Sequence, residues 1–235
     1  MILEALQHYK SHIEAQGFSV YTIMLKGSQN YNLSDETSDI DANAILIPTI
    51  AQLRNKVNPK FTFETGEVTC HDIYSFAEIV SKGNPQWIEV CHTEFKLGGD
   101  LSMFKHFEVN PSALKGMVME KVVAFDKLYP ARAKYIDQKE LAKQLHHIIR
   151  LYDVLNLGVK VHKYFGESRD FMLDIKRGRL PATKEEAFLL RDEYVAKLSA
   201  IYEAKRLSYS PQPVDYKTLD TIVMNHYLAT YKEIQ

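Results

Sequence analysis

The sequence is short of the features that mark secreted and membrane-spanning proteins. Its two cysteines, Cys70 and Cys91, show no metal-binding spacing, so we expect buried, reduced thiols in a cytoplasmic protein. No apolar run approaches the roughly 18 residues of a membrane helix, and no signal peptide or lipidation motif is present. A soluble protein without a membrane partner is therefore expected.

The charge balance is equally plain. A net charge of −1 argues against a protein that coats nucleic acid by bulk electrostatics, although it allows a local basic groove. With 46% hydrophobic and 25% charged residues, the composition is that of an ordinary globular protein. A chain of 235 residues can hold one large domain or two small domains that share an interface.

The stretch from Met24 to Ile47 concentrates the polar chemistry. We expect a buried strand over 18–25 and a second strand over 40–47, opened by Ser38-Asp39-Ile40-Asp41. Side chains two residues apart on a strand project from one face, with Cα atoms about 6–7 Å apart. Two carboxylates placed in this way repel each other unless a cation lies between them. Mg²⁺ is a suitable cation, because it favours one or two carboxylates together with phosphate oxygens.

The residues just upstream are suited to the phosphate. Gly27 lets the backbone approach an anion closely, and the N–H groups that follow, with the hydroxyl of Ser28, can contact its oxygens at the start of a short helix. Lys26 precedes them and can add positive charge. The alternative is a polar, solvated turn, since Ser34, Asp35 and Glu36 lie close by.

These residues resemble the DNA polymerase beta-like nucleotidyltransferases. The motif consists of Gly27-Ser28, a spacer with Tyr31 and Leu33, and Ser38-Asp39-Ile40-Asp41. The string GSQNYNLSDETSDID is similar to a bacterial and phage branch, some members of which are associated with RNA repair. The later segments KGNPQWIEVCH, LAKQLHHIIRLYDVL and MLDIKRGRLPATKEEAFLL also resemble this branch, so the resemblance covers most of the chain.

The resemblance implies a metal-dependent enzyme, a nucleotidyltransferase. Asp39 and Asp41 would bind two divalent ions, Mg²⁺ or Mn²⁺, together with a nucleoside triphosphate. The family usually adds a third carboxylate from a neighbouring strand, for which Glu67 is preferred and Asp72 is the alternative. Asp72 can equally cap the helix that follows it. Members of the branch carry other residues where Gln29, Asn32 and Asn43-Ala44 stand here, so base and acceptor are not carried over.

Further candidates for nucleotide binding lie outside the motif. In the helix expected over 137–157, Lys143, His146 and Arg150 are spaced to share one face. Arg150 and Lys143 would clamp phosphates of the nucleotide or of an RNA end, the arginine through its planar fork. Tyr31 would stack on a base, or instead pack the short helix against the sheet.

The pattern predicts an α+β fold. Residues 1–95 would form a nucleotidyltransferase core, a small mixed sheet flanked by helices, with a hairpin turn at Thr65-Gly66. Residues 96–235 would form a C-terminal helical bundle packed on that core. Helices are expected over 2–16, 74–82, 86–92, 112–128, 137–157, 169–177, 183–207 and 215–233, with capping boxes at Asp137/Glu140 and Thr183/Glu186.

Three functions are open at this point. The leading hypothesis is transfer of a nucleoside monophosphate from an NTP to an acceptor hydroxyl, with release of pyrophosphate. The acceptor would be an RNA or tRNA 3′ end, a protein or a small molecule. The second is a catalytically inactive nucleotide-binding or antitoxin-like regulatory protein with a protein partner. The third is an RNA-binding module that uses the helical half and binds with a steep salt dependence.

Overall fold

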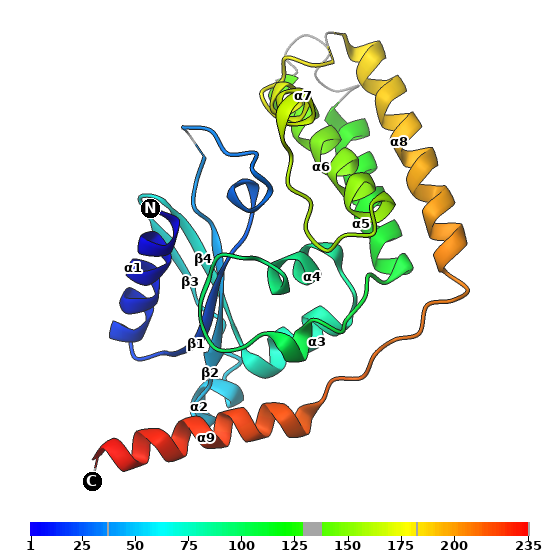
Figure 1. Ribbon diagram of the computed structural model, residues 1–235. Coiled ribbons are helices and arrows are strands. Elements are labelled where there is room, and N and C mark those ends of the chain that lie inside the picture. Colours follow the sequence, from blue (N-terminus) through cyan, green and yellow to red (C-terminus); the bar gives the residue numbers. More distant parts are fainter. Residues whose placement is uncertain (37, 129–137, 182, 235) are drawn as a thin grey trace. The chain divides into compact units, whose positions relative to one another are not determined.

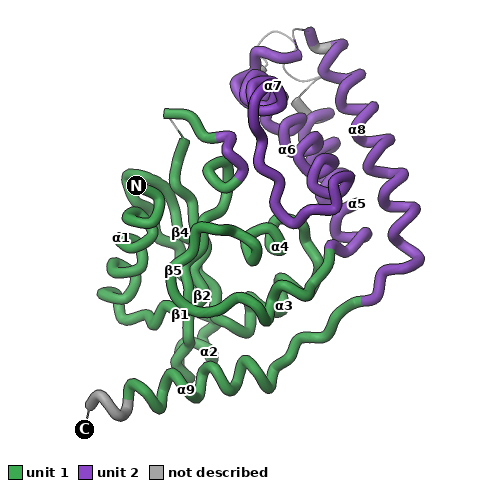
Figure 2. The backbone as a smooth tube through the Cα atoms, in the orientation of Figure 1, with its two compact units in different colours: residues 1–30, 34–108, 211–235 green, residues 31–33, 109–210 purple. Residues whose placement is uncertain are grey.

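The computed structural model describes residues 1–36, 38–128, 138–181 and 183–234 (Figure 1). The chain divides into two compact units (Figure 2). The sheet unit comprises residues 1–30, 34–108 and 211–235, and the helical unit comprises residues 31–33 and 109–210.

The sheet unit is built on a five-stranded mixed sheet in the order β3-β4-β2-β1-β5. Strand β1 (Ser19–Leu25) is antiparallel to both β2 (Ala42–Ile47) and β5 (Lys96–Gly98). Strand β2 runs parallel to β4 (Gly66–Asp72), which forms an antiparallel hairpin with β3 (Lys60–Phe63). The predicted α+β class, its mixed sheet and its hairpin are confirmed.

The core of this unit follows from the alternation of side chains along the strands. Every residue of β2 is buried. Ala42, Ala44 and Leu46 pack with Leu6, Tyr9 and Ile13 of helix α1 (Ile2–Ala15). The opposite face of the sheet is covered by α3 (Ile73–Ser81) and α4 (Pro85–Cys91) (Figure 1). Short elements complete the unit: η1 (Ser28–Tyr31), whose last residue belongs to the helical unit, α2 (Ile50–Arg54) and η2 (Ser102–Phe104).

The last helix, α9 (Tyr216–Ile234), belongs to the sheet unit. Tyr74 donates a hydrogen bond to Asp220 at 2.8 Å, and Tyr227 donates to the carbonyl of Pro48 at 2.7 Å. The domain boundary expected at residue 95 lies just before β5. That expectation assigned α9 to the C-terminal bundle. The two compact units divide the chain after residue 108, and the chain returns to the sheet unit at residue 211.

The helical unit contains α5 (Pro111–Leu128), α6 (Gln138–Asn156), α7 (Gly166–Lys176) and α8 (Lys184–Lys205). Their apolar faces meet in clusters that include Leu114, Ile148 and Leu198. The capping box of α8 is present, with Thr183 and Glu186 bonding reciprocally. The other expected box depends on Asp137, which lies outside the described residues.

Both cysteines are buried, as expected. Burial raises the pKa of each thiol to about 12. In the part of the chain that the structure describes, no helix is both long enough and apolar enough to cross a membrane.

Candidate functional site

The end of strand β1 and the start of strand β2 bring Gly27 beside Asp41. Leu25 pairs with Ala42, and one step further the N–H of Lys26 donates to the carbonyl of Asp41 at 2.8 Å. Gly27 has a φ of +79°, which glycine adopts without strain. A Cβ on Gly27 would lie 3.8 Å from Oδ2 of Asp41. The glycine turn and one predicted carboxylate are therefore neighbours.

Asp39 and Asp41 lie immediately before β2 rather than within it, which corrects the expectation that they sit on the strand. The alternation nevertheless continues through them. Ile40 is buried in the core of the sheet unit, and its N–H donates to the carbonyl of Thr65 at 2.7 Å. Asp39 is exposed and Asp41 is half-buried. The two carboxylates thus flank an anchored residue.

One oxygen of Asp41 is fixed by the neighbouring strand. Because β2 and β4 run parallel with Ala42 opposite Val68, the backbone of Glu67 comes alongside Asp41. The N–H of Glu67 donates to Oδ1 of Asp41 at 3.1 Å. With Oδ1 held in this way, Oδ2 lies on the side of Gly27. The orientation of this carboxylate is set before any ligand arrives.

The side chain of Glu67 is held by two lysines. Its carboxylate lies 2.6 Å from Nζ of Lys60 and 3.5 Å from Nζ of Lys26. The hydrogen bond from Lys60, followed by the charges of Lys26 and Lys60, lowers the pKa of Glu67 against the opposing effect of desolvation. Lys26 also donates to Oγ1 of Thr69 at 3.3 Å. Glu67 therefore compensates two cations.

The alternative third carboxylate, Asp72, caps helix α3. It is 6% exposed and accepts hydrogen bonds from the N–H groups of Tyr74 and Ser75, and from the hydroxyl of Ser75. The sequence left this capping role open beside the metal role. Among the described residues, no three His, Cys, Asp or Glu side chains gather closely enough to hold a metal ion. The expected triad of Asp39, Asp41 and Glu67 is not assembled.

The residues present still fit a magnesium ion that arrives with a phosphate group. Mg²⁺ is commonly held by one or two carboxylates plus phosphate oxygens. Asp41 supplies one carboxylate beside the Gly27 turn, and Asp39 is exposed two residues before it. The Ser28 side chain, at the first position of η1, is half-buried there. A second metal ion would need a further ligand, because the Glu67 carboxylate is paired with Lys60.

One buried residue of the loop was not singled out from the sequence. Asn30 is 1% exposed, and its Oδ1 accepts a hydrogen bond from Oγ1 of Thr93 at 2.8 Å. Its N–H donates to the carbonyl of Gly27 at 3.0 Å, which closes the turn. Its Nδ2 is buried and has no hydrogen-bond partner among the described residues. A lone asparagine in a polar loop carries no local pattern that announces this role.

The three residues of α6 that were expected to share a binding face differ in their exposure to solvent. Lys143 is exposed, whereas His146 is 6% and Arg150 is 1% exposed. The guanidinium carbon of Arg150 lies 4.1 Å from the centroid of the Tyr31 ring. Burial, helped by the charges of His147, Arg150 and Lys176, keeps the pKa of His146 well below its usual range.

Tyr31 lies in the core of the helical unit. Its exposed fraction is 7%, and it packs in a cluster with Leu33, Leu145 and Ile149. Arg150 covers one face of its ring. Of the two roles expected for Tyr31, packing describes its position, although it packs against helices rather than against the sheet.

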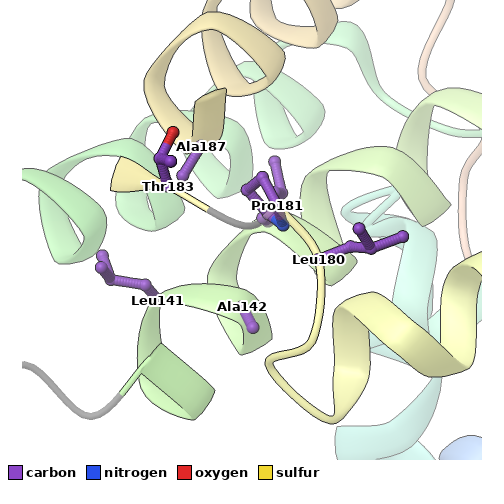
Figure 3. A pocket seen from close by; sticks show the side chains of 7 residues that line it. Leu141, Ala142, Leu180, Pro181, Thr183 and Ala187 are labelled. Carbon is purple, nitrogen blue, oxygen red and sulfur yellow. The ribbon is translucent and has the colours of Figure 1, made fainter. Parts of the chain in front are cut away.

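A small pocket in the helical unit is almost wholly apolar (Figure 3). Its lining consists of Leu141, Ala142, Leu145, Leu180, Pro181, Thr183 and Ala187. It carries no charged group to receive a triphosphate, so it is distinct in chemistry from the Gly27–Asp41 region.

Comparisons with known proteins add little. No protein-family model and no curated protein matches the chain. A solved structure of a nucleotidyltransferase-like protein from Exiguobacterium sibiricum 255-15 aligns with 87% of this chain and 76% of its own, at 15% sequence identity and a TM-score of 0.32. A likeness this weak does not support a function.

Proposed function

We propose that this protein is a metal-dependent nucleotidyltransferase. It would move a nucleoside monophosphate from an NTP to an acceptor hydroxyl and release pyrophosphate. The observation that carries the proposal is the placement of the Asp41 carboxylate against the Gly27 turn, with Asp39 exposed two residues away. Such a pair of carboxylates beside an anion-binding turn suits a triphosphate with its metal ion.

Each residue of the proposed site has its own role in binding the triphosphate and the metal ion. The N–H groups and hydroxyl at Gly27 and Ser28 hold phosphate oxygens, and Lys26 adds charge beside them. Asp39 and Asp41 hold the divalent ion, Mg²⁺ or Mn²⁺. Bound there, such an ion would neutralise charge on the triphosphate and favour loss of the acceptor's proton. Lys143, the exposed one of the three candidates on α6, remains a candidate contact for a phosphate of the nucleotide or of an RNA end.

The reaction needs no covalent enzyme intermediate. The acceptor oxygen attacks the α-phosphorus, and a new P–O bond forms as the bond to the bridging oxygen breaks. Pyrophosphate leaves with that electron pair, and the hydroxyl proton passes to solvent. Positioning and charge neutralisation account for most of the catalysis of such transfers.

In this proposal Glu67 forms ion pairs with Lys26 and Lys60 and does not bind the metal ion. Its carboxylate orients Lys26 beside Gly27 through the contact at 3.5 Å, while Lys60 supports it at 2.6 Å. In this arrangement the expected second metal ion lacks its third carboxylate. That same feature favours the second hypothesis, an inactive nucleotide-binding or regulatory protein.

The test is a transfer assay across all acceptors. The protein is incubated with each NTP labelled at the α-phosphate, with Mg²⁺ or Mn²⁺, and with or without total cellular RNA. Label is then followed into RNA, into protein and into small molecules. Asp39→Asn and Asp41→Asn should abolish transfer, whereas Asp192→Asn, an exposed acid paired with Arg191, should not. Retained transfer in either motif variant would overturn the proposal.

Thermal stability separates the enzyme from a regulatory protein that binds no nucleotide. A ligand that binds only the native state raises its stability. For an enzyme of this type, ATP and Mg²⁺ together should raise Tm, and neither should do so alone. No shift, combined with a tight protein partner, would favour the regulatory reading.

A further inference from the structure

The chain passes between its two units inside the motif itself. It leaves the sheet unit after Asn30, spends residues 31–33 in the helical unit, and returns at Ser34. The remaining crossings, at 108/109 and 210/211, are far away in the sequence. The segment 31–33 therefore joins the Gly27–Ser28 turn to the helices through three residues (Figure 2).

The helical unit holds the backbone of this segment at every residue. The N–H of Tyr164 donates to the carbonyl of Tyr31 at 3.1 Å. Nε of Arg169 donates to the carbonyl of Asn32 at 2.9 Å, and Nζ of Lys176 donates to the carbonyl of Leu33 at 2.9 Å. Two of these donors carry a full positive charge, which strengthens such bonds.

The side chains of the segment are held as well. Leu33 is fully buried among α6 and α7 residues, and the ring of Tyr31 lies under Arg150. Asn32 has a φ of +60°, a left-handed conformation that asparagine tolerates better than most residues. Its Nδ2 donates to the carbonyl of Tyr164 at 2.8 Å, which supports that conformation.

On the other side of the crossing, Asn30 is anchored in the sheet unit through Thr93. The chain is thus fixed immediately before and immediately after the bond from Asn30 to Tyr31. Along the chain only Gln29 and Asn30 separate Ser28 from Tyr31, and each residue adds at most about 3.6 Å of reach.

We infer that Arg169 and Lys176 are positioning residues for the triphosphate turn. They hold the carbonyls of Asn32 and Leu33, and through the short chain behind them they fix the N–H groups and hydroxyl of Ser28. Neither side chain contacts the substrate in this role. The inference rests on the proposed function and adds that helix α7 sets the geometry of its phosphate site.

Hydrogen–deuterium exchange tests directly, without an activity assay, whether Arg169 and Lys176 fix this segment. Exchange of peptides covering residues 26–36 is compared in the wild-type protein, Arg169→Gln and Lys176→Gln. Loss of the charged donors should speed exchange in this stretch by about tenfold, because local opening becomes easier. Two matched controls, Arg206→Gln and Lys197→Gln, remove ion pairs of α8 with Glu203 and Glu193. They should leave the stretch unchanged.

A kinetic comparison then separates positioning from stability alone. Arg169→Gln and Lys176→Gln should raise KM for the NTP severalfold and lower kcat, while Lys176→Arg, which keeps a charged donor, should restore both. A purely structural role would lower Tm of the Gln variants without moving KM. If Arg169→Gln fails to fold, Lys176→Gln decides.

The outcomes distinguish this inference from the proposed function. Unchanged exchange over 26–36 in Lys176→Gln would overturn the inference, as would faster exchange with an unchanged KM. Absence of transfer in the wild-type protein would refute the proposed function. It would also remove any catalytic role for the hydrogen bonds from Arg169 and Lys176. The exchange data would still show whether the two side chains fix the turn.

Discussion

The guanidinium of Arg150 lies over the ring of Tyr31, with its carbon 4.1 Å from the ring centroid. Both residues are buried, at 1% and 7% exposure. From the sequence, each was a candidate nucleotide contact, one for phosphate and one for a base. In the structure they contact each other, and this contact holds Tyr31, the last residue of η1, in the helical unit.

The Arg150–Tyr31 contact should be measurable as stability. Tyr31→Leu removes the ring and should cost about 1–2 kcal/mol, the range of a desolvated cation–π contact. Tyr31→Phe keeps the ring face and should cost much less. Chemical denaturation of the two variants provides the comparison. Equal stability of Tyr31→Leu and the wild-type protein would show that the contact contributes nothing.

Gly27 should matter for ligand binding beyond its backbone conformation. Gly27→Ala and Gly17→Ala both place alanine at a positive φ, +79° and +84°, and each should lose about 1–2 kcal/mol. Only at Gly27 does the new Cβ face Asp41, since nothing lies within 4 Å of the position at Gly17. Differential scanning fluorimetry with ATP and Mg²⁺ should show the ligand-induced rise in Tm for Gly17→Ala and a reduced rise for Gly27→Ala. Equal rises would contradict this.

The carboxylates of Asp41 and Glu67 should differ sharply in their effect on transfer, although the backbone N–H of Glu67 bonds to Asp41. Asp41→Asn keeps an oxygen for that hydrogen bond but loses its charge, and should lower kcat/KM by at least about a hundredfold. Glu67→Gln keeps an acceptor for Lys60 and Lys26, and should lose about tenfold or less. Steady-state kinetics decide the matter. Equal losses would make Glu67 a metal ligand after all.

The histidines His146 and His147 of α6 should make stability depend on pH. Burial, followed by the charges of Arg150, Lys121 and Lys143, lowers the pKa of His147 from 6.5 to about 3. Between these values the unfolded chain binds a proton that the folded chain does not. Stability is therefore fully present above about pH 6.5 and declines as the pH falls towards 3, by about 1.4 kcal/mol per pH unit.

His147→Gln isolates this contribution. The free energy of unfolding of the wild-type protein and of the variant is measured by denaturation at several values between pH 7.5 and 4. The wild-type curve should fall more steeply, because the variant lacks the titrating ring. Parallel curves would show that His147 does not take part.

Local pattern was enough to predict much of the sheet unit. The apolar runs at 18–25 and 40–47 gave β1 and β2, and Thr65-Gly66 gave the hairpin. The reason is that these features are encoded within a few residues. The same holds for the placement of Asp41 next to the Gly27 turn, which follows once two neighbouring strands are paired.

What the sequence could not supply depends on distant residues. Asn32 meets Tyr164 132 positions away, and Lys176 meets Leu33 143 positions away. Helical spacing grouped Lys143, His146 and Arg150, but it could not show that the last two turn inward. Likewise, Glu67 was considered as a metal ligand because the resembled family carries a third carboxylate on a neighbouring strand. The sequence could not show its pairing with Lys26 and Lys60, which become its neighbours only in the folded sheet.

The most direct test of nucleotidyl transfer compares the position of the label in the nucleotide. The wild-type protein is given ATP labelled at either the α- or the γ-phosphate, with Mg²⁺ and the acceptor pool. We predict that the α-label enters the acceptor and that the γ-label appears only in pyrophosphate. With Asp41→Asn, neither the labelled acceptor nor labelled pyrophosphate should form. Transfer of γ-label to the acceptor, or no transfer of either label, would contradict the account.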